Sequence, residues 1–532
     1  MAATLEKQRF DGISRNPEHH KFERTIYLVS PENPGLQERV GQKVLGITSA
    51  FGIIGSETQK LRDESGFRNS VDIKLVEENR PGEKLEYKAG DLLLISSFSV
   101  NAVRTAEIIK EAREKGAYVI VGGIHATVSA QTEHAMINFA ELGALNFVGE
   151  AGNSEVFRDL IKCYLEKGKV PQGMNIFSEG FDEETRLPKL HGINLAGLPF
   201  RWSIYDQLDN NTLMYYMMTQ EGCPRNCSYC TATKTCGKII RTRPPEDVIG
   251  EYLLRGLDEK GVFLADSDSL SKKPYAFGEL LPAFARIPRR AGMTIETSIE
   301  RLDGLDDEEW DLMKAAGINK IWVGAESPDP DVLRAYSKEC NLKYCDPKEM
   351  RRIINKAHKR GIQVYGFFMI GSPVETVKSI RMLPDYIKKA GFDGGNVNCF
   401  TLFPGAELTE DLIARGIYKP KIEDLPNLTF KVPAPIEIAM GVDVFISERA
   451  RLNKELYNIE RFFGRATPAF VRSVIHRNPR SIRKTFGTTF ASEFGFTVMH
   501  REKGLDELNK VIDFLDERKR KKSEPTTIYS AN

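Results

Sequence analysis

The sequence predicts an α/β protein with a doubly wound parallel sheet in its first part, a second α/β unit after it and a helical C-terminal region. Between Thr25 and Val148, short apolar runs of strand length alternate five times with helix-length segments, a pattern that favours a parallel sheet with helices on both faces. From Leu213 to Leu402, a second series of apolar runs follows. Beyond about residue 416 helical spacing prevails.

Each strand of the first part has its own signature. The run 26–29 ends at Ser30-Pro31, and proline stops a strand. Residues 71–76 alternate apolar and polar side chains, as an outer strand does, whereas residues 91–96 contain a continuous apolar run, as a strand buried on both faces does. The remaining predicted elements are a helix at 101–115 and strands at 118–121 and 145–148. We expect this unit to span residues 25–168.

The loops that follow these strands are rich in glycine and serine. In parallel sheets, ligands bind beyond the carboxyl ends of the strands, where small residues let the backbone approach closely. The loops concerned are 30–31, 96–99, 122–127 and 149–152. From them we predict ligand contacts by Ser96, Gly122, Gly123, His125 and Glu150. For His125 the alternative is a structural role within its loop.

The second unit begins with an apolar run at 213–218 and a loop that carries three cysteines, Cys223, Cys227 and Cys230. Their Cys-x3-Cys-x2-Cys spacing lets one loop wrap around a single inorganic cluster. Iron–sulfur clusters are normally held by four thiolates, so three leave one iron open for chemistry. The alternative is a zinc or disulfide knot, with Cys236 as a fourth ligand.

With Tyr229 directly before the last cysteine, this motif resembles the radical S-adenosylmethionine (SAM) superfamily. The resemblance implies a [4Fe-4S] cluster on Cys223, Cys227 and Cys230, with SAM chelated to the open iron through its amino and carboxylate groups. It implies that an electron from the cluster cleaves the sulfonium and releases a 5′-deoxyadenosyl radical. An electron donor such as flavodoxin or ferredoxin is the expected partner. Tyr229 is expected to stack near adenine or to pack.

Five later landmarks match the family in order, which implies a partial (β/α)6 barrel for residues 201–415. They are the acid-capped run 262–268, the run 293–301, the GxES-like end at 321–327, the GxPxET-like turn at 371–376, and the PGT-like end at 404–408 with Ala406 in place of Thr.

Barrel strands bring their carboxyl ends to one mouth. We therefore expect the cysteines to share a cavity with Asp266, Asp268, Glu300, Glu326 and Ser327. By resemblance, Glu326 and Ser327 hold the ribose or the methionine end of SAM. The alternative for each acid is a helix N-cap or a surface pair. No side chain is assigned as a catalytic group.

The loop order of residues 25–168 resembles the cobalamin-binding domain that precedes the radical domain in one large subgroup. The glycine turn at 122–127 departs from that pattern at Ile124, where proline is usual, and residues 151–154 replace its acidic end. No Asp-x-His-x-x-Gly segment is present, and the resemblance then implies base-off cobalamin. The alternative is a flavodoxin-like domain that binds another nucleotide or no ligand.

Together the two resemblances imply methylation of an unactivated carbon by a 5′-deoxyadenosyl radical and methylcobalamin. The alternative is ring closure or rearrangement without methyl transfer, with a lipid among the candidate substrates. The substrate class (lipid, peptide or small molecule) is open. The leftover cysteines Cys236, Cys340, Cys345 and Cys399 leave an auxiliary cluster as an alternative to buried apolar roles.

The composition of the chain limits which partners it can bind and in which cellular compartment we expect it. Lys and Arg number 75 against 74 Asp and Glu, so no net field attracts nucleic acid. No run of eighteen apolar residues occurs and residues 1–12 lack a secretory signal, so we expect a cytoplasmic protein. Eight cysteines in 532 residues do not make a disulfide scaffold.

The remaining segments have weaker signals. We expect an arm at 1–24, a Pro- and Gly-rich linker at 169–200, and a helical region at 416–532 that ends in a disordered tail. Residues 461–496 combine arginine with phenylalanine and have no acid before Glu493. Such a surface suits peripheral contact with anionic lipid, and the alternative is a helix that packs on the core with its arginines in water.

Overall fold

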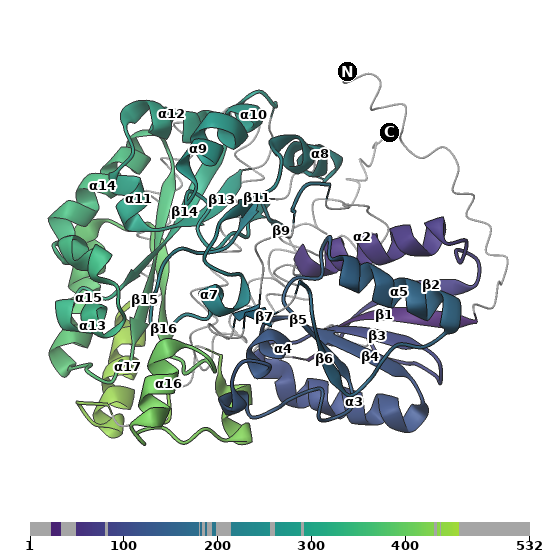
Figure 1. The fold of residues 1–532 in the computed structure, drawn as a ribbon. Helices are drawn as coiled ribbons and strands as arrows, with labels where there is room; N and C mark the ends of the chain where they lie inside the picture. The colour runs from purple at the N-terminus through teal and green to yellow at the C-terminus, as the bar shows by residue number, and fades with distance from the viewer. Residues whose placement is uncertain are drawn as a thin grey trace, which may run out of the picture.

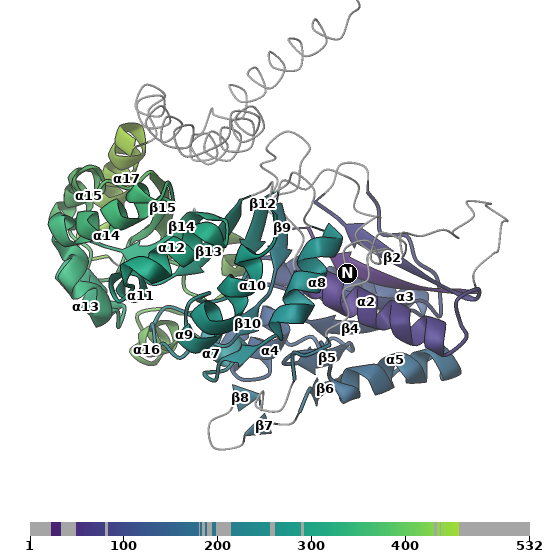
Figure 2. The same ribbon diagram turned by 90° about the horizontal axis from the view of Figure 1, so that it is seen from above.

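Two parallel α/β units stand side by side in the computed structural model (Figures 1 and 2). The structure describes residues 23–32, 49–79, 83–179, 181–182, 187–188, 194–197, 214–255, 261–288, 292–429, 433–436 and 438–456. The predictions for the N-terminal arm, the 461–496 surface and the C-terminal tail fall outside these ranges. No helix in the described ranges has the length and apolar character needed to cross a membrane.

The first unit is a six-stranded sheet in which every pairing is parallel. Its strands are β1 (Arg24–Ser30), β2 (Val71–Glu77), β3 (Leu92–Ser96), β4 (Tyr118–Gly122), β5 (Leu145–Val148) and β6 (Met174–Phe177). The order β2-β1-β3-β4-β5-β6 reverses between β1 and β3, which is the ligand-binding crevice of doubly wound sheets. The predicted doubly wound sheet is confirmed, with the alternating strand β2 at an edge and the apolar strand β3 inside.

Helices cover both faces of this sheet. One apolar cluster joins the sheet to α2 (Ser49–Glu64) and α5 (Glu155–Lys167), and another joins it to α3 (Ala102–Lys115). The second cluster also takes in Leu425 and Leu428, from and beside the short helix η7 (Ile422–Asn427). The C-terminal part of the chain therefore packs back onto the first unit.

Strand β6 lies inside the predicted linker 169–200, so the first sheet extends past residue 168. Its side chains are half-buried or exposed, and a strand on the rim of a sheet needs no continuous apolar run. The pairing of β6 with β5 therefore depends on contacts that the local sequence does not display.

The second unit is a six-stranded parallel sheet with its strands in sequence order. They are β9 (Met214–Met217), β12 (Gly261–Leu264), β13 (Met293–Thr297), β14 (Ile318–Glu326), β15 (Gln363–Ile370) and β16 (Gly394–Cys399). Within the described residues β9 and β16 are its two edges, as an open (β/α)6 barrel requires. Each strand overlaps a predicted apolar run, although β16 begins three residues before its predicted run at 397–402 and ends within it.

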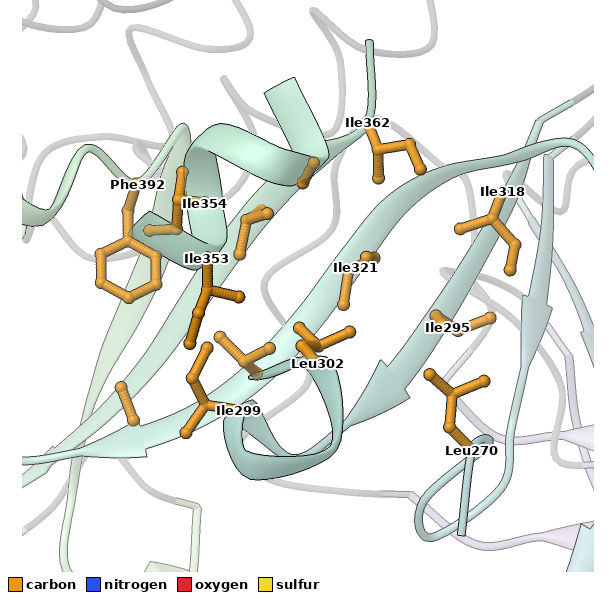
Figure 3. Packing of buried hydrophobic residues seen from close by; sticks show 14 of the residues in the cluster. Leu270, Ile295, Ile299, Leu302, Ile318, Ile321, Ile353, Ile354, Ile362 and Phe392 are labelled. Carbon is orange, nitrogen blue, oxygen red and sulfur yellow. The ribbon is translucent and has the colours of Figure 1, made fainter. Parts of the chain in front are cut away.

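Helices cover the outer face of this sheet and build the largest core of the molecule (Figure 3). Ile295 on β13, Ile321 on β14, and Ile353 and Ile354 on α14 (Pro347–Lys359) all belong to that core (Figure 3). The covering helices are α8 (Pro245–Arg255), α10 (Leu281–Ala285), α11 (Ile299–Asp303), α12 (Asp307–Ala315), α14 (Pro347–Lys359), α15 (Val377–Ala390) and α17 (Val442–Leu456). Since successive strand residues face opposite sides, the residues between the core positions line the inner face of the barrel.

Short elements connect these layers. Helices α4 (Ile124–Ser129) and α7 (Ala232–Thr235) meet at the junction of the two units. The hairpin of β10 (Gln220–Glu221) and β11 (Arg241–Thr242) encloses the cysteine loop. The others are β7 (Phe181–Asp182), β8 (Leu187–Pro188), α9 (Lys273–Tyr275), α13 (Pro330–Ala335), α16 (Glu407–Ala414), η2 (Ser99–Asn101), η3 (Glu133–Ala135), η5 (Ala276–Leu280) and η6 (Glu339–Cys345).

Candidate functional site

The cysteine loop begins at a glycine that no other residue can replace. Gly222 has φ +105°, and a Cβ there would lie 2.2 Å from the carbonyl oxygen of Ile239. One residue later, the Cys223 N–H donates to the Gly237 carbonyl oxygen at 3.0 Å. Glycine alone combines this backbone conformation with so close an approach. The two ends of the loop are thus held together at its base.

The middle of the loop is fastened to the mouth of the barrel. Ser228 N–H donates to the Tyr336 carbonyl oxygen at 3.2 Å, and Ser228 Oγ donates to the Ala335 carbonyl oxygen at 3.1 Å. The Ser228 carbonyl oxygen accepts from Leu408 N–H at 2.8 Å. These contacts bring together residues far apart in the chain. The loop is thus held through Ser228, and the cysteine side chains on either side of it are not needed to fix the backbone.

The three thiols are accessible to different degrees: Cys223 and Cys227 are half-buried and Cys230 is exposed. Cys230 Sγ accepts the Ala232 N–H at 3.4 Å, as a cluster-bound thiolate can. The surrounding protein removes enough solvent to raise the pKa of Cys230 to about 11. A bound metal centre would stabilise the thiolate form of this side chain.

The donor set suits a cluster better than a single ion. In the part of the chain that the structure describes, no three His, Cys, Asp or Glu side chains converge as the ligands of one metal ion do. In a cubane each thiolate binds a different iron, so its thiolates need not converge on one point. Cys236, the alternative fourth ligand, lies against Thr235, with its Sγ 3.5 Å from Thr235 Oγ1.

A buried ion pair beneath the loop joins it to the end of β14. Tyr229 OH donates to Glu326 Oε1 at 2.8 Å, and Lys338 Nζ donates to the same oxygen at 3.1 Å. Glu326 has φ +62° and Ser337, next to Lys338, has φ +50°. Left-handed backbone at non-glycine residues is uncommon and costs energy, and it gathers at functional sites.

The same pair sets the charge state of the loop's tyrosine. Burial, and then the Glu326 carboxylate, raise the pKa of Tyr229 well above its ordinary value. Burial lowers the pKa of Lys338, but Glu326 more than offsets this and raises it overall. The raised pKa values keep Tyr229 a phenol and Lys338 an ammonium at neutral pH. Sequence reasoning missed Lys338, because it lies in an irregular segment that matches no motif.

Of the five polar residues expected around one cavity, two are committed to holding strands together. Asp266 accepts Thr219 N–H and Oγ1–H, both at 2.7 Å, and so ties β12 to the end of β9. Asp268 accepts Arg301 Nε–H at 2.7 Å. Their carboxylates are buried and not available to a ligand. Asp268 Oδ2 also lies 3.8 Å from Arg225 Nε on the cysteine loop, so the cavity shared by all five residues stays a prediction.

The other members of that group also differ. Glu300 lies beside the cysteine loop, where it accepts from Arg225 Nη1 at 3.0 Å. Arg225 and Glu300 line a depression of about 410 Å³ that also includes Arg301. Ser327 Oγ accepts the Asp329 N–H at 3.1 Å, a local turn contact. Glu326 is the one of the five that reaches the cysteine loop through Tyr229.

Glu296 is a site residue that the motif comparison missed. It lies on β13 next to the core residue Ile295, and therefore on the inner face of the barrel. Its side chain is accessible to water, yet burial by the surrounding barrel, and then the Glu326 charge, raise its pKa to about 7. On the inner face of β16, Asn396 Oδ1 is buried and has no hydrogen-bond partner among the described residues. Both groups suit contact with a polar ligand.

The inner face of the barrel also carries a row of aromatic rings from four strands. Ring centroids of Tyr216 and Phe263 are 5.3 Å apart, those of Phe263 and Trp322 are 4.7 Å apart, and those of Trp322 and Phe367 are 5.3 Å apart. The row passes across β13 where that strand has Thr294, whose small side chain leaves room. These aromatic rings form an apolar surface inside the barrel.

At the first sheet, close packing explains the glycine turn. Gly123 has φ +97°, and a Cβ there would lie 2.7 Å from the Ser97 carbonyl oxygen. Gly122 pairs with Ser96 in the ladder between β3 and β4, and its carbonyl oxygen accepts the Ser97 N–H at 2.9 Å. Ser96 is half-exposed at this edge. The loops after β3 and β4 therefore form one layer at the carboxyl edge.

His125 does not face that edge. It is fully buried, with Nε2 3.1 Å from the Ile137 carbonyl oxygen and Nδ1 3.1 Å from Ser99 Oγ. Because a carbonyl oxygen can only accept, Nε2 carries the proton. Desolvation lowers the pKa of His125 to about 4, so the ring is neutral. The predicted ligand contact by His125 does not fit this position, and its structural alternative does.

Glu150 is likewise committed, since its Oε2 accepts from Arg241 Nη1 at 2.7 Å. Arg241 lies on β11, in the hairpin that encloses the cysteine loop. The predicted ligand contact by Glu150 therefore becomes a contact between the two units of the fold. Among the residues predicted for the first sheet, Ser96, Gly122 and Gly123 remain at its carboxyl edge.

Comparison with known proteins matches these features. Residues 217–405 match the model of the radical SAM superfamily. The chain is 23% identical to bacteriochlorophyllide d C-12(1)-methyltransferase of Chlorobaculum tepidum over 346 residues, 64% of this chain and 70% of that protein. It is 24% identical to hopanoid C-2 methylase of Rhodopseudomonas palustris over 379 residues, 70% of this chain and 67% of that protein.

A solved structure shares the arrangement of both units. TsrM from Kitasatospora setae, a radical SAM methyltransferase with cobalamin and a [4Fe-4S] cluster bound, has a TM-score of 0.52 at 16% identity and covers 74% of this chain and 75% of its own. A second structure, of TsrM with tryptophan substrate and a SAM analogue, has a TM-score of 0.55 at 14% identity, with 93% and 99% covered. At these identities the likeness is one of fold.

We predict that Lys338→Met destabilises the barrel by about 3–5 kcal/mol, because it leaves the buried Glu326 carboxylate unpaired. Urea unfolding followed by tryptophan fluorescence measures the change; Trp310 and Trp322 lie in the barrel unit. Lys343→Met is the matched control: Lys343 pairs with Asp303 at 2.8 Å but is 55% exposed, so we expect a loss below about 1 kcal/mol. Equal losses in the two variants would contradict the prediction.

We predict that His125 makes the first unit sensitive to acid. In the unfolded chain a histidine titrates near pH 6.5, whereas the buried ring has a pKa of about 4. Between these two pKa values the histidine is protonated in the unfolded state but not in the folded state. The free energy of unfolding therefore falls as the pH falls. The thermal midpoint of the wild type should drop more from pH 7 to pH 5 than that of His125→Asn. Parallel pH dependences would sink this prediction.

Proposed function

Residues 217–405 form a radical SAM domain, and from that premise we propose that the protein is a cobalamin-dependent radical SAM enzyme that methylates an unactivated carbon of its substrate. The observation that carries the proposal is the three-thiol loop at the mouth of a parallel barrel, adjoining a doubly wound sheet with an open carboxyl edge. Relatives that align with 346 and 379 residues include enzymes named for methylating a bacteriochlorophyllide and a hopanoid.

The protein's own residues would hold the cofactors and exclude water from them. When bound, SAM on a [4Fe-4S] cluster would supply a 5′-deoxyadenosyl radical and cobalamin would supply a transferable methyl group. Cys223, Cys227 and Cys230 would hold the cluster. Tyr229 and Lys338 both donate to Glu326 and so hold the loop that would carry the cluster against the end of β14. Hard chemistry belongs to the cofactors, and the protein contributes orientation and exclusion of water.

The inner face of the barrel supports an apolar substrate. The row of Tyr216, Phe263, Trp322 and Phe367 can bind a ring system or hydrocarbon by stacking and burial. Glu296, whose pKa is about 7, can hold or release one proton beside that surface at neutral pH. Bacteriochlorophyllide and hopanoid, the compounds named for two relatives, are ring systems with large apolar surfaces.

The first sheet supports a corrinoid at its carboxyl edge. Ser96 and the Gly122-Gly123 turn leave the backbone close to any ligand there, in the crevice where the strand order reverses between β1 and β3. His125 is buried behind this edge, which agrees with cobalamin that takes no histidine from this loop. We further propose that a flavodoxin or ferredoxin reduces the cluster. Peripheral membrane contact through 461–496 stays a prediction.

We predict that replacing Cys223, Cys227 and Cys230 by alanine abolishes iron and sulfide binding, and with it the reductive cleavage of SAM to 5′-deoxyadenosine. Cys163→Ala, on α5 of the first unit, is the control and should keep both. Iron and sulfide analysis after anaerobic reconstitution and quantification of 5′-deoxyadenosine provide the readouts. Turnover without the three thiols would refute the assignment.

Product mass decides the reaction class. Extracts of cells with and without the gene, analysed by mass spectrometry, should differ by a compound that has gained one methylene unit. A product that has instead lost hydrogen would indicate ring closure, the alternative reaction of the same cofactors.

A further inference from the structure

The two units of the fold meet at three buried charged side chains, Glu150, Glu221 and Arg241, which we call the interdomain trio. Arg241 donates from Nη1 to Glu150 Oε2 at 2.7 Å and from Nη2 to Glu221 Oε2 at 3.0 Å. Their side chains are only 9% (Arg241), 14% (Glu150) and 20% (Glu221) exposed. Glu150 follows β5 of the first sheet and the other two belong to the β10–β11 hairpin, so one guanidinium joins the units.

At the hairpin, the trio is continuous with the cysteine loop. Glu221 and Arg241 are partners in the ladder of β10 and β11. Glu221 is followed directly by Gly222 and Cys223, the residues that the close contact with Ile239 and Gly237 holds in place. A shift of Arg241 would therefore move its ladder partner Glu221. Through the constrained backbone of Gly222, it would also move the thiol of Cys223.

At its other end, the trio is continuous with the carboxyl edge of the first sheet. Glu150 follows Gly149, whose N–H donates to Thr127 Oγ1 on α4 at 3.1 Å. Just after α4, Gln131 Nε2 donates to the Thr127 carbonyl oxygen at 3.0 Å and to the Lys234 carbonyl oxygen, on α7 of the other unit, at 2.9 Å. The loop layer of the first sheet is thus fastened to the region of the cysteine loop at two neighbouring points.

The charges of the trio favour arginine at its centre. Burial first, and then the Glu221 charge, raise the pKa of Glu150 well above its ordinary value. Arg241 makes a hydrogen bond to each of the two carboxyl groups. A planar guanidinium presents parallel N–H donors to two carboxyl groups at once, which the compact ammonium of lysine does not.

We infer that Arg241 is a positioning residue that sets the separation of the corrinoid from the cluster, an inference that rests on the proposed function. The two cofactor sites belong to separately packed units, and a group carried by one cofactor must meet a carbon activated at the other. Rates of such transfers depend on near-contact geometry, and a misplacement of about 1 Å costs roughly 100-fold. The hydrogen bonds of Arg241 connect Glu150, in a loop of the first sheet, with Glu221, which directly precedes the cysteine loop. They therefore restrict how far apart the two cofactor sites can lie.

The test measures the distance between cofactors and not turnover. The full chain is reconstituted anaerobically with iron, sulfide and cob(II)alamin, and the cluster is reduced so that both centres are paramagnetic. Pulsed electron paramagnetic resonance then gives the distribution of their separation in the wild type, in Arg241→Lys and in Glu150→Ala. The second variant leaves the charge-balanced pair of Arg241 and Glu221 within the hairpin, so it folds even if the first does not.

Arg243→Lys is the matched control. Arg243 lies two residues beyond Arg241, its side chain is only 1% exposed, and its Nη1 donates to Glu251 Oε2 on α8 of the second unit at 2.7 Å. We expect one narrow distribution in the wild type and the control. Arg241→Lys and Glu150→Ala should give a shifted mean or a broader distribution at unchanged iron and corrinoid content.

The outcomes separate the inference from the proposed function. Distributions that stay unchanged in Arg241→Lys and Glu150→Ala overturn the inference while the proposed function stands, and so does equal broadening in Arg243→Lys. If the wild type shows a cluster but binds no corrinoid, which its absorption spectrum reveals before any variant is made, the proposed function fails and the inference falls with it.

Discussion

A loop that presents three thiols to a shared cluster must be rigid without using those thiols to become so, and the fold meets this constraint by fastening the backbone between them. Gly222 seals the base of the loop against Ile239. Ser228, between the second and third cysteines, makes three hydrogen bonds to segments that follow β14 and β16. The side chains of Cys223, Cys227 and Cys230 are left to bind metal. The rest of the barrel serves this arrangement by bringing those segments to one mouth.

The polar residues at the strand ends divide the work between structure and chemistry. The carboxylate of Asp266 accepts a hydrogen bond from a backbone N–H, and that of Asp268 accepts one from an arginine. These bonds fix the ends of β9 and β12 near the loop. Glu326 is held in a left-handed conformation between Tyr229 and Lys338. Glu296, by contrast, stays accessible to water with a raised pKa. Buried carboxylates that are fully satisfied rigidify a site, and those that are not can act in it.

The two sheets pack in separate apolar clusters. Contacts between the two units therefore fix how they lie relative to one another. Here the contacts are specific hydrogen bonds, from Arg241 and Gln131, and a C-terminal segment near η7 that packs back onto α3. Directional contacts of this type define a distance better than an apolar interface of equal area would.

The sequence by itself determined the parts of this protein that depend on local spacing. It predicted the strands of both sheets except β6 from apolar runs, the edge position of β2 from its alternation, and the three thiols from their separation on one loop. It also indicated the glycines before and within the ligand loops, because tight turns require glycine wherever φ is positive. These features need only a residue and its near neighbours.

Only the tertiary structure decided which side chains meet. His125 turned inward to Ile137 and Ser99, and Glu150 turned across the junction to Arg241. Lys338 reached Glu326, and the rim strand β6 joined the first sheet without an apolar run of its own. The physical reason is the same in each case. A buried polar group takes the partner that the packing of distant elements brings within reach, and no local pattern records how those elements pack.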